Sequence, residues 1–400
     1  MPAGPNFNVC ERPGAYVPRN PEKTVLYGVV AGHLETFLAR QREGDRAVPR
    51  FVERELRAFL DCGVLARGFL RVHCDACGLD RLVPYSCKGR SFCPSCGGRR
   101  MADPAAHLVD HVFPEVSVRQ WVLSVPHASR YRLAYDSSLV RDVLQILVRT
   151  IFASIRRRAG IPASNRQARC GAVAFIQRFS DALNLDPHFH VLVLDGIYVM
   201  DGKGALVFRR VSQPTDKEVA HVAERIHRRA ARLIEKRGLG SQADPDEADG
   251  FRQDEPLLAE LYDTSVSGRA ATGPRAGMRI VRVGDEVDPE DGTLPSDPCC
   301  ASLAGFSVHA GVCIPARDRL RLERLARYAG RPPLATERLS LLPDGSLLYR
   351  LKRRWLDGTT HVIYEPLELM ERSLRLFILR GSISQGTTEC LRLQQASGPG

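Results

Sequence analysis

The sequence predicts an α+β protein that is built on an antiparallel sheet with helices beside it. Two apolar, β-favouring runs lie close together in the chain, from Gly171 to Phe179 and from Leu185 to Leu194. Each run has the length and composition of a buried strand. The connection around residues 180–187 permits the two runs to pair in an antiparallel sense.

Helical and strand patterns alternate irregularly along the rest of the chain. Apolar residues at near-helical spacing predict helices over residues 24–37, 52–60, 103–112, 138–157, 215–238 and 316–329. Short β-favouring runs predict further strands over residues 118–125 and 306–309. The helices before residue 113 are expected to form a separate N-terminal module.

Composition points to a basic, globular protein. The chain has 400 residues, 44% of them hydrophobic, which allows two or three domains with sizeable cores. A formal net charge of +11 indicates an anionic partner, most simply nucleic acid. Because no apolar run approaches the ~18 residues of a membrane span and the first residues lack a signal-peptide core, we expect a cytoplasmic protein. The twelve cysteines then need a role other than disulfide formation.

Two C-x-x-C pairs, separated by fifteen residues, predict a structural zinc site. The predicted ligands are Cys74, Cys77, Cys93 and Cys96. Four thiolates close a tetrahedral site and leave no position for water, whereas a redox dithiol would more naturally use a single C-x-x-C. Cys87 and His73 lie close enough in sequence to compete as ligands, and we interpret Cys87 as a small packed residue.

A pair of histidines flanks one phenylalanine in the second β-run. Because side chains alternate along a strand, His188 and His190 should point to the same face, roughly 6.6 Å apart. This arrangement suits a metal ion held by two imidazoles, although two packed histidines would give the same pattern. Gln177 on the neighbouring strand is the candidate third ligand, and an ordinary cross-strand hydrogen bond is the alternative.

A tyrosine lies on the basic side of the helix predicted over residues 316–329. At 3.6 residues per turn, Tyr328 falls near Arg317, Arg321 and Arg324 rather than on the leucine side. A tyrosine among arginines fits a nucleophile beside a backbone phosphate, and a boundary tyrosine of an amphipathic helix is the alternative.

Basic residues are concentrated near this tyrosine. Residues 317–354 hold eleven Arg or Lys against four Asp or Glu. The candidate DNA-binding side chains are those of Arg317, Arg321, Arg324, Arg327, Lys352, Arg353 and Arg354. Tyr349, Trp355 and Tyr364 lie among or near them, either as a surface for single-stranded nucleic acid or as the inward face of a hairpin that turns at residues 343–345.

These motifs together resemble a known family. The segments concerned are the cysteine segment, VRQWVLSVP, FIQRF followed by LNLDPHFHVLVLDGIY, RYAGRPPLATERLSLLPDG and DGTTHVIYEPLELMER. Together they resemble the insertion-sequence ninety-one transposases, which belong to the HUH single-strand endonuclease superfamily. The resemblance spans about residues 24–375. It implies an HUH-like antiparallel sheet flanked by helices, with an N-terminal zinc-binding domain.

The resemblance also implies a reaction. Single-stranded DNA at an element end would be cleaved by a tyrosine, giving a covalent 5′-phosphotyrosine intermediate, with Mg²⁺ or Mn²⁺ held by the histidine pair. Many members carry two tyrosines four residues apart, whereas Arg324 stands at the first of these positions and leaves Tyr328 alone. The alternative functions are those of a plasmid-type replication initiator and of a zinc-dependent DNA-binding regulator without catalysis.

The resulting domain prediction has four parts. We expect a flexible leader over 1–20, a helical and zinc-binding DNA-binding domain over 21–113, a catalytic domain over 114–376 and an atypical, disordered tail over 377–400. The acidic stretches near 239–256 and 285–298 are expected to be irregular, solvated inserts of the catalytic domain.

Overall fold

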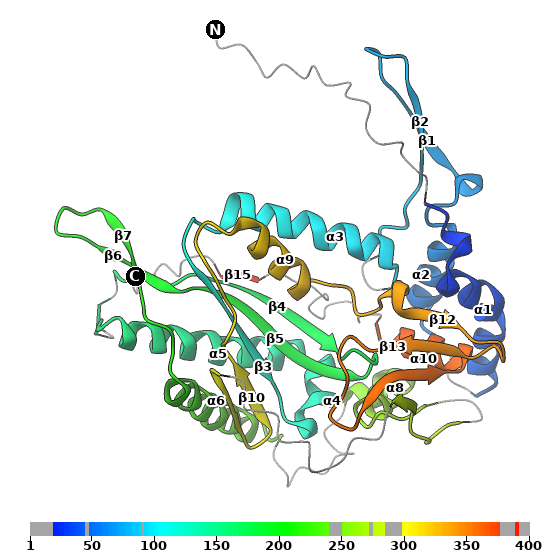
Figure 1. Ribbon diagram of the computed structural model, residues 1–400. Coiled ribbons are helices and arrows are strands. Elements are labelled where there is room, and N and C mark those ends of the chain that lie inside the picture. The colour runs from blue at the N-terminus through cyan, green and yellow to red at the C-terminus, as the bar shows by residue number, and fades with distance from the viewer. Residues whose placement is uncertain are drawn as a thin grey trace.

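The computed structural model describes residues 19–44, 48–89, 92–162, 164–165, 167–239, 250–271, 275–284 and 298–376, together with the backbone of residues 389–391 (Figure 1). The predicted leader therefore lies almost entirely outside the described residues, as do residues 240–249 and 285–297 of the two predicted inserts.

A mixed α/β architecture organises the described chain around an antiparallel sheet. Its strands lie in the order β15-β4-β5-β3-β10-β9, and β11 also pairs with β3. The strands are β3 (Val118–Ser124), β4 (Ala172–Phe179), β5 (Leu185–Leu194), β9 (Cys300–Leu303), β10 (Phe306–His309), β11 (Cys313–Ile314) and β15 (Glu389–Leu391). Every strand pair is antiparallel, as the sequence predicts for β4 and β5.

Helices cover both faces of this sheet (Figure 1). One face packs on α5 (Ser137–Arg158) and α6 (Asp216–Lys236), which contribute apolar side chains to a core shared with Phe189, Val191 and Val193 of β5. The opposite face packs on α3 (Pro94–His107), the π-helix Leu108–Val112 and α9 (Arg319–Ala329). The alternation along β5 turns Leu192 and Leu194 toward this second face, and the histidines with them.

A second apolar core joins the N-terminal helices to the C-terminal part of the chain. It contains side chains of α1 (Val25–Glu43), α2 (Arg50–Asp61), α8 (Pro256–Val266) and α10 (Pro366–Leu374). A four-stranded sheet of order β12-β13-β14-β8 packs into it. Its strands are β12 (Leu339–Leu341), β13 (Leu347–Arg350), β14 (Thr359–Tyr364) and β8 (Val281–Gly284).

Two hairpins lie outside these layers. The pairs are β1 (Phe69–His73) with β2 (Asp80–Pro84), and β6 (Gly196–Met200) with β7 (Leu206–Arg210). Figure 1 shows β1 and β2 extending away from the body of the protein. The remaining described α-helices are α4 (His127–Tyr135) and the short α7 (Gly250–Asp254).

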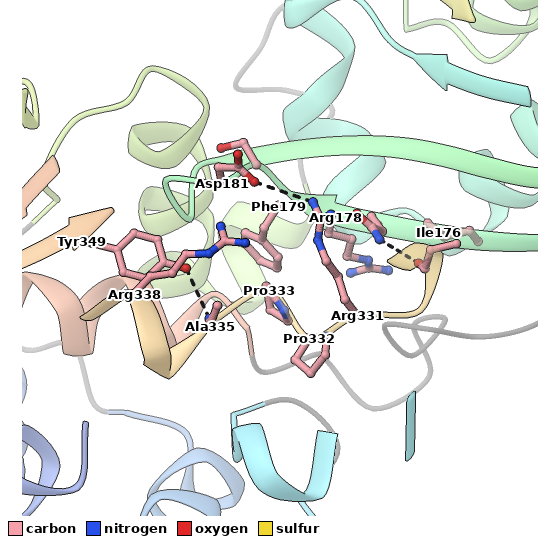
Figure 2. Close-up of a pocket in the computed structure, with 13 residues that line it drawn as sticks. Ile176, Arg178, Phe179, Asp181, Arg331, Pro332, Pro333, Ala335, Arg338 and Tyr349 are labelled. Carbon is pink, nitrogen blue, oxygen red and sulfur yellow. Dashed lines mark hydrogen bonds and ion pairs between the residues drawn. The ribbon is translucent and has the colours of Figure 1, made fainter. Parts of the chain in front are cut away.

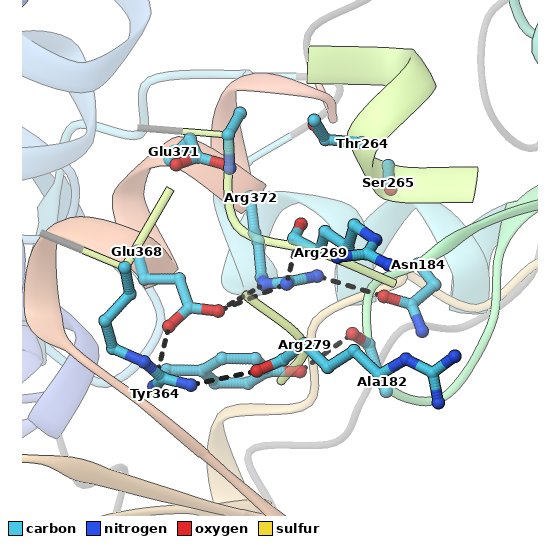
Figure 3. A network of polar contacts seen from close by, with 12 residues as sticks. Ala182, Asn184, Thr264, Ser265, Arg269, Arg279, Tyr364, Glu368, Glu371 and Arg372 are labelled. Atoms are coloured by element: carbon cyan, nitrogen blue, oxygen red, sulfur yellow. Dashed lines mark hydrogen bonds and ion pairs between the residues drawn. The ribbon is translucent and has the colours of Figure 1, made fainter. Parts of the chain in front are cut away.

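A buried polar network holds α10 against the connection between β4 and β5 (Figure 3). The Arg372 guanidinium donates to Glu368 at 3.1 Å and to the side-chain oxygen of Asn184 at 3.0 Å. The hydroxyl of Tyr364 donates to the carbonyl oxygen of Ala182 at 2.7 Å. The C-terminal helix therefore fixes the segment from which β5 begins.

Most predicted elements are present, with some differences. The helix predicted from residue 103 begins at Pro94 instead, with Cys93 as its N-cap residue and a proline in its first turn. Gly250–Asp254 is helical rather than irregular. Residues 389–391 form β15, which pairs with Ala172–Ala174, in a tail for which no strand was predicted.

In the part of the chain that the structure describes, no helix is both long and apolar enough to cross a membrane.

Candidate zinc and nucleotidyl-transfer sites

Four cysteines meet between the N-terminal helices and α3. The cluster is formed by Cys62, Cys87, Cys93 and Cys96, whose sulfur atoms all lie within 4.8 Å of one another. Cys62 follows the end of α2, Cys87 lies in the loop after β2, and Cys93 and Cys96 stand at the beginning of α3. The cluster therefore joins the end of α2, the loop after β2 and the beginning of α3.

The sulfur geometry fits a tetrahedral zinc ion. The Sγ atoms of Cys62 and Cys96 are 3.7 Å apart, and those of Cys87 and Cys96 are 3.6 Å apart. Four sulfurs at about 2.3 Å from a central Zn²⁺ would be separated by about 3.8 Å. Hydrogen bonds from Cys87 and Cys93 hold the pKa of the Cys62 thiol below its ordinary value, whereas hydrogen bonds within the cluster raise the pKa of Cys87 and Cys93.

This cluster differs from the ligand set expected from the two C-x-x-C pairs. Cys93 and Cys96 belong to it, but Cys74 and Cys77 lie at the turn of the β1–β2 hairpin. Five residues of strand separate that turn from the base of the hairpin, roughly 16 Å at 3.3 Å per residue. Cys87, expected to be only a packed residue, is one of the four clustered thiols.

On the central sheet, the strand register brings the predicted metal ligands together. Gln177 of β4 lies directly opposite His188 of β5. The rings of His188 and His190 have centroids 5.1 Å apart. Both imidazoles face α9, because Phe189 between them is buried against the other layer.

Two lone pairs converge between Gln177 and His188. His188 Nδ1 lies 2.7 Å from the Asp186 carbonyl oxygen, so Nδ1 carries the proton and Nε2 presents its lone pair. The Gln177 amide nitrogen donates to the carbonyl oxygen of Ala329 at 2.7 Å, which turns its oxygen toward the histidine. That oxygen lies 3.2 Å from His188 Nε2. Two acceptors at this distance suit a shared cation at about 2.1 Å from each.

His190 is buried and has one nitrogen without a hydrogen-bond partner. Its Nε2 is such an orphan, whereas its Nδ1 lies 2.8 Å from the side-chain amide of Gln120 on β3. As placed, the Gln120 amide nitrogen donates to Nδ1, so the ring proton lies on Nε2; a half-turn of the Gln120 amide would put the proton on Nδ1 and leave a lone pair on Nε2 for a cation. Burial holds the pKa of His190 well below its ordinary value, and the adjacent His188 lowers it further. Both features favour the neutral, metal-binding form of the ring.

Tyr328 lies against this histidine pair. Its ring is 5.8 Å from that of His190, centroid to centroid, at an interplanar angle of 84°. α9 carries the tyrosine, and the Gln177 amide also donates to the Tyr328 carbonyl oxygen at 3.2 Å. The same glutamine therefore contacts both the histidine and the helix of the tyrosine, although 151 residues separate it from Tyr328 in the chain.

Two cations surround the Tyr328 ring. Lys352 Nζ lies 3.5 Å from the ring centroid, and the Arg331 guanidinium carbon lies 4.3 Å from it. Burial alone would raise the pKa of the Tyr328 phenol, but the charges of Arg331 and Lys352 and their hydrogen bonds outweigh it and lower the pKa. The phenolate is thus easier to form here than in water.

A small cavity lies beside this site (Figure 2). It has a volume of about 40 Å³ and is lined by residues of β4, the segment after α9 and Tyr349. Arg331 points across it toward Asp181, with nitrogen and oxygen 3.6 Å apart. The space accommodates water-sized groups rather than a nucleotide base.

The predicted DNA-binding side chains are all exposed. They are those of Arg317, Arg321, Arg324, Arg327, Lys352, Arg353 and Arg354. Of the aromatic residues among them, Tyr349 and Tyr364 are buried, at 1% and 0% exposure, which favours the hairpin with inward aromatics over a stacking surface. Trp355 is half-buried and lies under the Arg282 guanidinium, 4.9 Å from ring centroid to guanidinium carbon.

Three residues of these sites were not predicted, because their local sequence gives a weak signal or none. Cys62 lies outside any C-x-x-C pair, Gln120 lies on a strand that reads as apolar core, and Arg331 follows α9 as one arginine among many. The alternation along VRQWVLSV puts Gln120 on the histidine face, and that spacing was the available signal.

Comparison with protein families identifies the class. Residues 29–125 match the family model described as "Transposase zinc-binding domain", and residues 171–382 match the transposase model described as "Putative transposase". The zinc-binding match contains the four-cysteine cluster, and the second match contains β4, β5 and α9. The protein is therefore a transposase with an N-terminal zinc-binding domain.

The zinc-binding model that matches is that of the insertion-sequence ninety-one transposases. The chain belongs to the insertion-sequence ninety-one family of transposases. No curated protein and no solved structure matches the chain.

Proposed function

We propose that this transposase cleaves and rejoins single-stranded DNA at the ends of its element through a covalent 5′-phosphotyrosine on Tyr328. The observation that carries the proposal is the contact of the Tyr328 ring with His190, at 5.8 Å between centroids, on the sheet face that bears His188. In this proposal the central sheet with its flanking helices is an HUH-like nuclease domain.

The chemistry needs no external energy source. The Tyr328 oxygen attacks the scissile phosphorus, the phenol loses its proton, and the bond from phosphorus to the 3′ oxygen breaks to leave a free 3′-hydroxyl. Attack by a 3′-hydroxyl on the phosphotyrosine reverses the step and restores both the phenol and a phosphodiester. One phosphodiester bond replaces another at each stage.

Arg331 and Lys352 would assist the attack. Their charges lower the pKa of the Tyr328 phenol and would also face the negative phosphate of the bound strand. The exposed arginines Arg317, Arg321, Arg324 and Arg327, with Arg353 and Arg354, would bind the phosphates of the flanking nucleotides.

His188, His190 and Gln177 would hold the Mg²⁺ or Mn²⁺ that this reaction needs. The His188 Nε2 lone pair, the unpartnered Nε2 of His190 and the Gln177 amide oxygen lie in one place and could supply three neutral donors. When bound, such an ion would draw charge from the scissile phosphate and the departing 3′ oxygen. In the N-terminal domain we assign Cys62, Cys87, Cys93 and Cys96 as ligands of a structural Zn²⁺.

Covalent capture tests the proposal. Labelled single-stranded oligonucleotides that tile the two flanks of the element are incubated with the protein and Mn²⁺, then analysed on a denaturing gel. We expect an SDS-resistant adduct with one end sequence, which Tyr328→Phe abolishes and the matched variant Tyr198→Phe retains.

Two results would contradict this proposal. Binding to an end without any adduct, or an adduct of equal yield in Tyr328→Phe, would reject the tyrosine mechanism. The first of these outcomes would leave a DNA-binding protein that acts without cleavage.

A further inference from the structure

The C-x-x-C pair of the β1–β2 hairpin has no role in the zinc cluster. Cys77 is exposed and Cys74 half-buried at the hairpin turn, whereas Cys62 and Cys87 occupy the positions once expected for them. The turn nevertheless has the backbone of a metal-binding knuckle. The Cys74 carbonyl oxygen accepts from the Cys77 and Gly78 amides, at 3.3 and 2.8 Å, and Gly78 adopts a φ of 65°.

This turn offers only half of a thiolate site. Within the described residues, Cys62, Cys87, Cys93 and Cys96 are the one group of three or more metal-ligating side chains that converge. The nearest imidazole, that of His73, is engaged by Asp80, with Nδ1 2.9 Å from the carboxylate oxygen. A knuckle of two cysteines needs two more donors from outside the hairpin to close a tetrahedron.

The hairpin also exposes large apolar side chains along both of its strands. Its exposed large apolar residues are Phe69, Leu70, Val72, Leu79, Leu82, Val83 and Tyr85, each between 38% and 55% exposed. β1 and β2 pair only with each other among the described strands. Two strands with apolar side chains on both faces gain stability from a partner surface.

The charge of the hairpin argues against DNA as that partner. Residues 69–84 contain two arginines and two aspartates, so the arm is neutral in a chain of net charge +11. One of these arginines, Arg71, is already paired with Asp80 at 2.6 Å. A neutral, apolar hairpin should therefore bind a second copy of itself more readily than it binds a polyanion such as DNA.

We infer that two copies of this transposase join through their β1–β2 hairpins around a shared Zn²⁺, held by Cys74 and Cys77 of each copy. Two knuckles related by a two-fold axis supply four thiolates, the number that closes a zinc site. The apolar arms behind the knuckles then cover one another. This inference is independent of the tyrosine chemistry, since neither hairpin cysteine lies near Tyr328 in the fold.

Zinc stoichiometry separates this inference from its alternatives. The full-length protein, purified under reducing conditions, is analysed for zinc and for mass by analytical ultracentrifugation. We expect a dimer with about 1.5 zinc ions per chain, one per chain in the cluster and one shared. The Cys74→Ser/Cys77→Ser variant should be a monomer with about one zinc per chain, and the turn variant Ala76→Ser should match the wild type.

Several results would overturn the inference. A wild-type protein with about one zinc per chain would leave the hairpin knuckle without metal. A monomer with about two zincs would mean that each chain completes its own second site. A double-serine variant that keeps both the dimer and the shared zinc would place the shared site elsewhere. Cobalt substitution, read from the thiolate-to-cobalt charge-transfer band, checks that the cluster stays intact in the variant.

Discussion

At the scale of single residues, the site depends on which atoms carry protons. Gln177 donates its amide hydrogens to α9 and leaves its oxygen facing His188 Nε2, and the Asp186 carbonyl fixes the tautomer of that ring. The sequence alone predicted the histidines, Gln177 and Tyr328, because strand alternation and helical spacing are local properties. It did not predict Gln120, Arg331 or Cys62, whose roles depend on contacts with segments distant in the chain; of the three, only Gln120 has a local signal, the strand alternation.

Lys352 should control the pH dependence of cleavage. Its charge helps to lower the pKa of Tyr328, so Lys352→Met should raise that pKa and move the rise of adduct formation to higher pH. At pH 7 the rate should fall about tenfold, which corresponds to about 1.4 kcal/mol of lost stabilisation. The measurement is the rate of adduct formation against pH.

The control for this prediction is Arg353→Met, which removes a neighbouring exposed charge. A Lys352→Met profile of unchanged shape but lower amplitude would mean that Lys352 only binds DNA.

Gln120 should act as a positioning residue for His190. Gln120→Leu removes the partner of His190 Nδ1, and loss of such a partner typically weakens metal binding about 10- to 100-fold. Adduct formation should then need correspondingly more Mn²⁺ while the maximal rate stays close to that of the wild type.

Titration of adduct yield with Mn²⁺ gives both quantities. If the Mn²⁺ requirement is unchanged and only the amount of folded protein drops, Gln120 is a packing residue and the assignment fails.

At the scale of elements, strand register positions the chemistry. β3 lies beside β5 with Gln120 paired to Leu192 and Val122 to His190, and the ion pair of Arg119 with Asp195 locks this register at the end of the two strands. The sequence predicted β3, β4 and β5 well because their apolar runs are long. It did not predict the β1–β2 hairpin, since exposed apolar side chains on a short arm have no core to explain them.

Breaking the Arg119–Asp195 pair should destabilise the sheet. Both side chains are 3% exposed, and the guanidinium donates to both carboxylate oxygens, at 3.0 and 2.9 Å. Asp195→Asn leaves a buried arginine without its charge partner, at a cost of about 3 kcal/mol in the free energy of unfolding. Urea denaturation measures the loss.

An apolar replacement of the whole pair is the informative comparison. Arg119→Met/Asp195→Leu should be less destabilised than Asp195→Asn, because no buried charge is left unpaired. Equal losses in the two variants would show that the pair contributes by packing and not by charge.

At the scale of the whole molecule, the chain assembles one surface from distant segments. α9 and the region after β13 supply the exposed basic residues, and the histidine strand lies beneath them, with more than 120 residues between the two in sequence. The resemblance to a transposase family predicted that a tyrosine acts together with the histidine pair, whereas composition showed only that the chain is basic. The cluster of Cys62, Cys87, Cys93 and Cys96 needed the three-dimensional arrangement, because only one of the two C-x-x-C pairs belongs to it and the other lies in the hairpin.

Binding of single-stranded DNA should lose part of its salt dependence when this surface is neutralised. Arg321→Ala and Arg324→Ala should each reduce the slope of log affinity against log salt by about 0.7 if each binds one phosphate. Arg228→Ala on α6 is the control, because it removes an exposed arginine of the helix layer on the other side of the sheet. An equal change in slope for all three variants would mean that general charge, and not this surface, attracts DNA.

The most direct test of the account is to find where the DNA becomes attached. The adduct with an element-end oligonucleotide is digested with protease and nuclease, and the peptide that carries the residual nucleotide is sequenced by mass spectrometry. The account predicts a nucleotide joined through its 5′ phosphate to Tyr328. A nucleotide attached to any other residue, or a cleaved strand with no attached peptide, would contradict it.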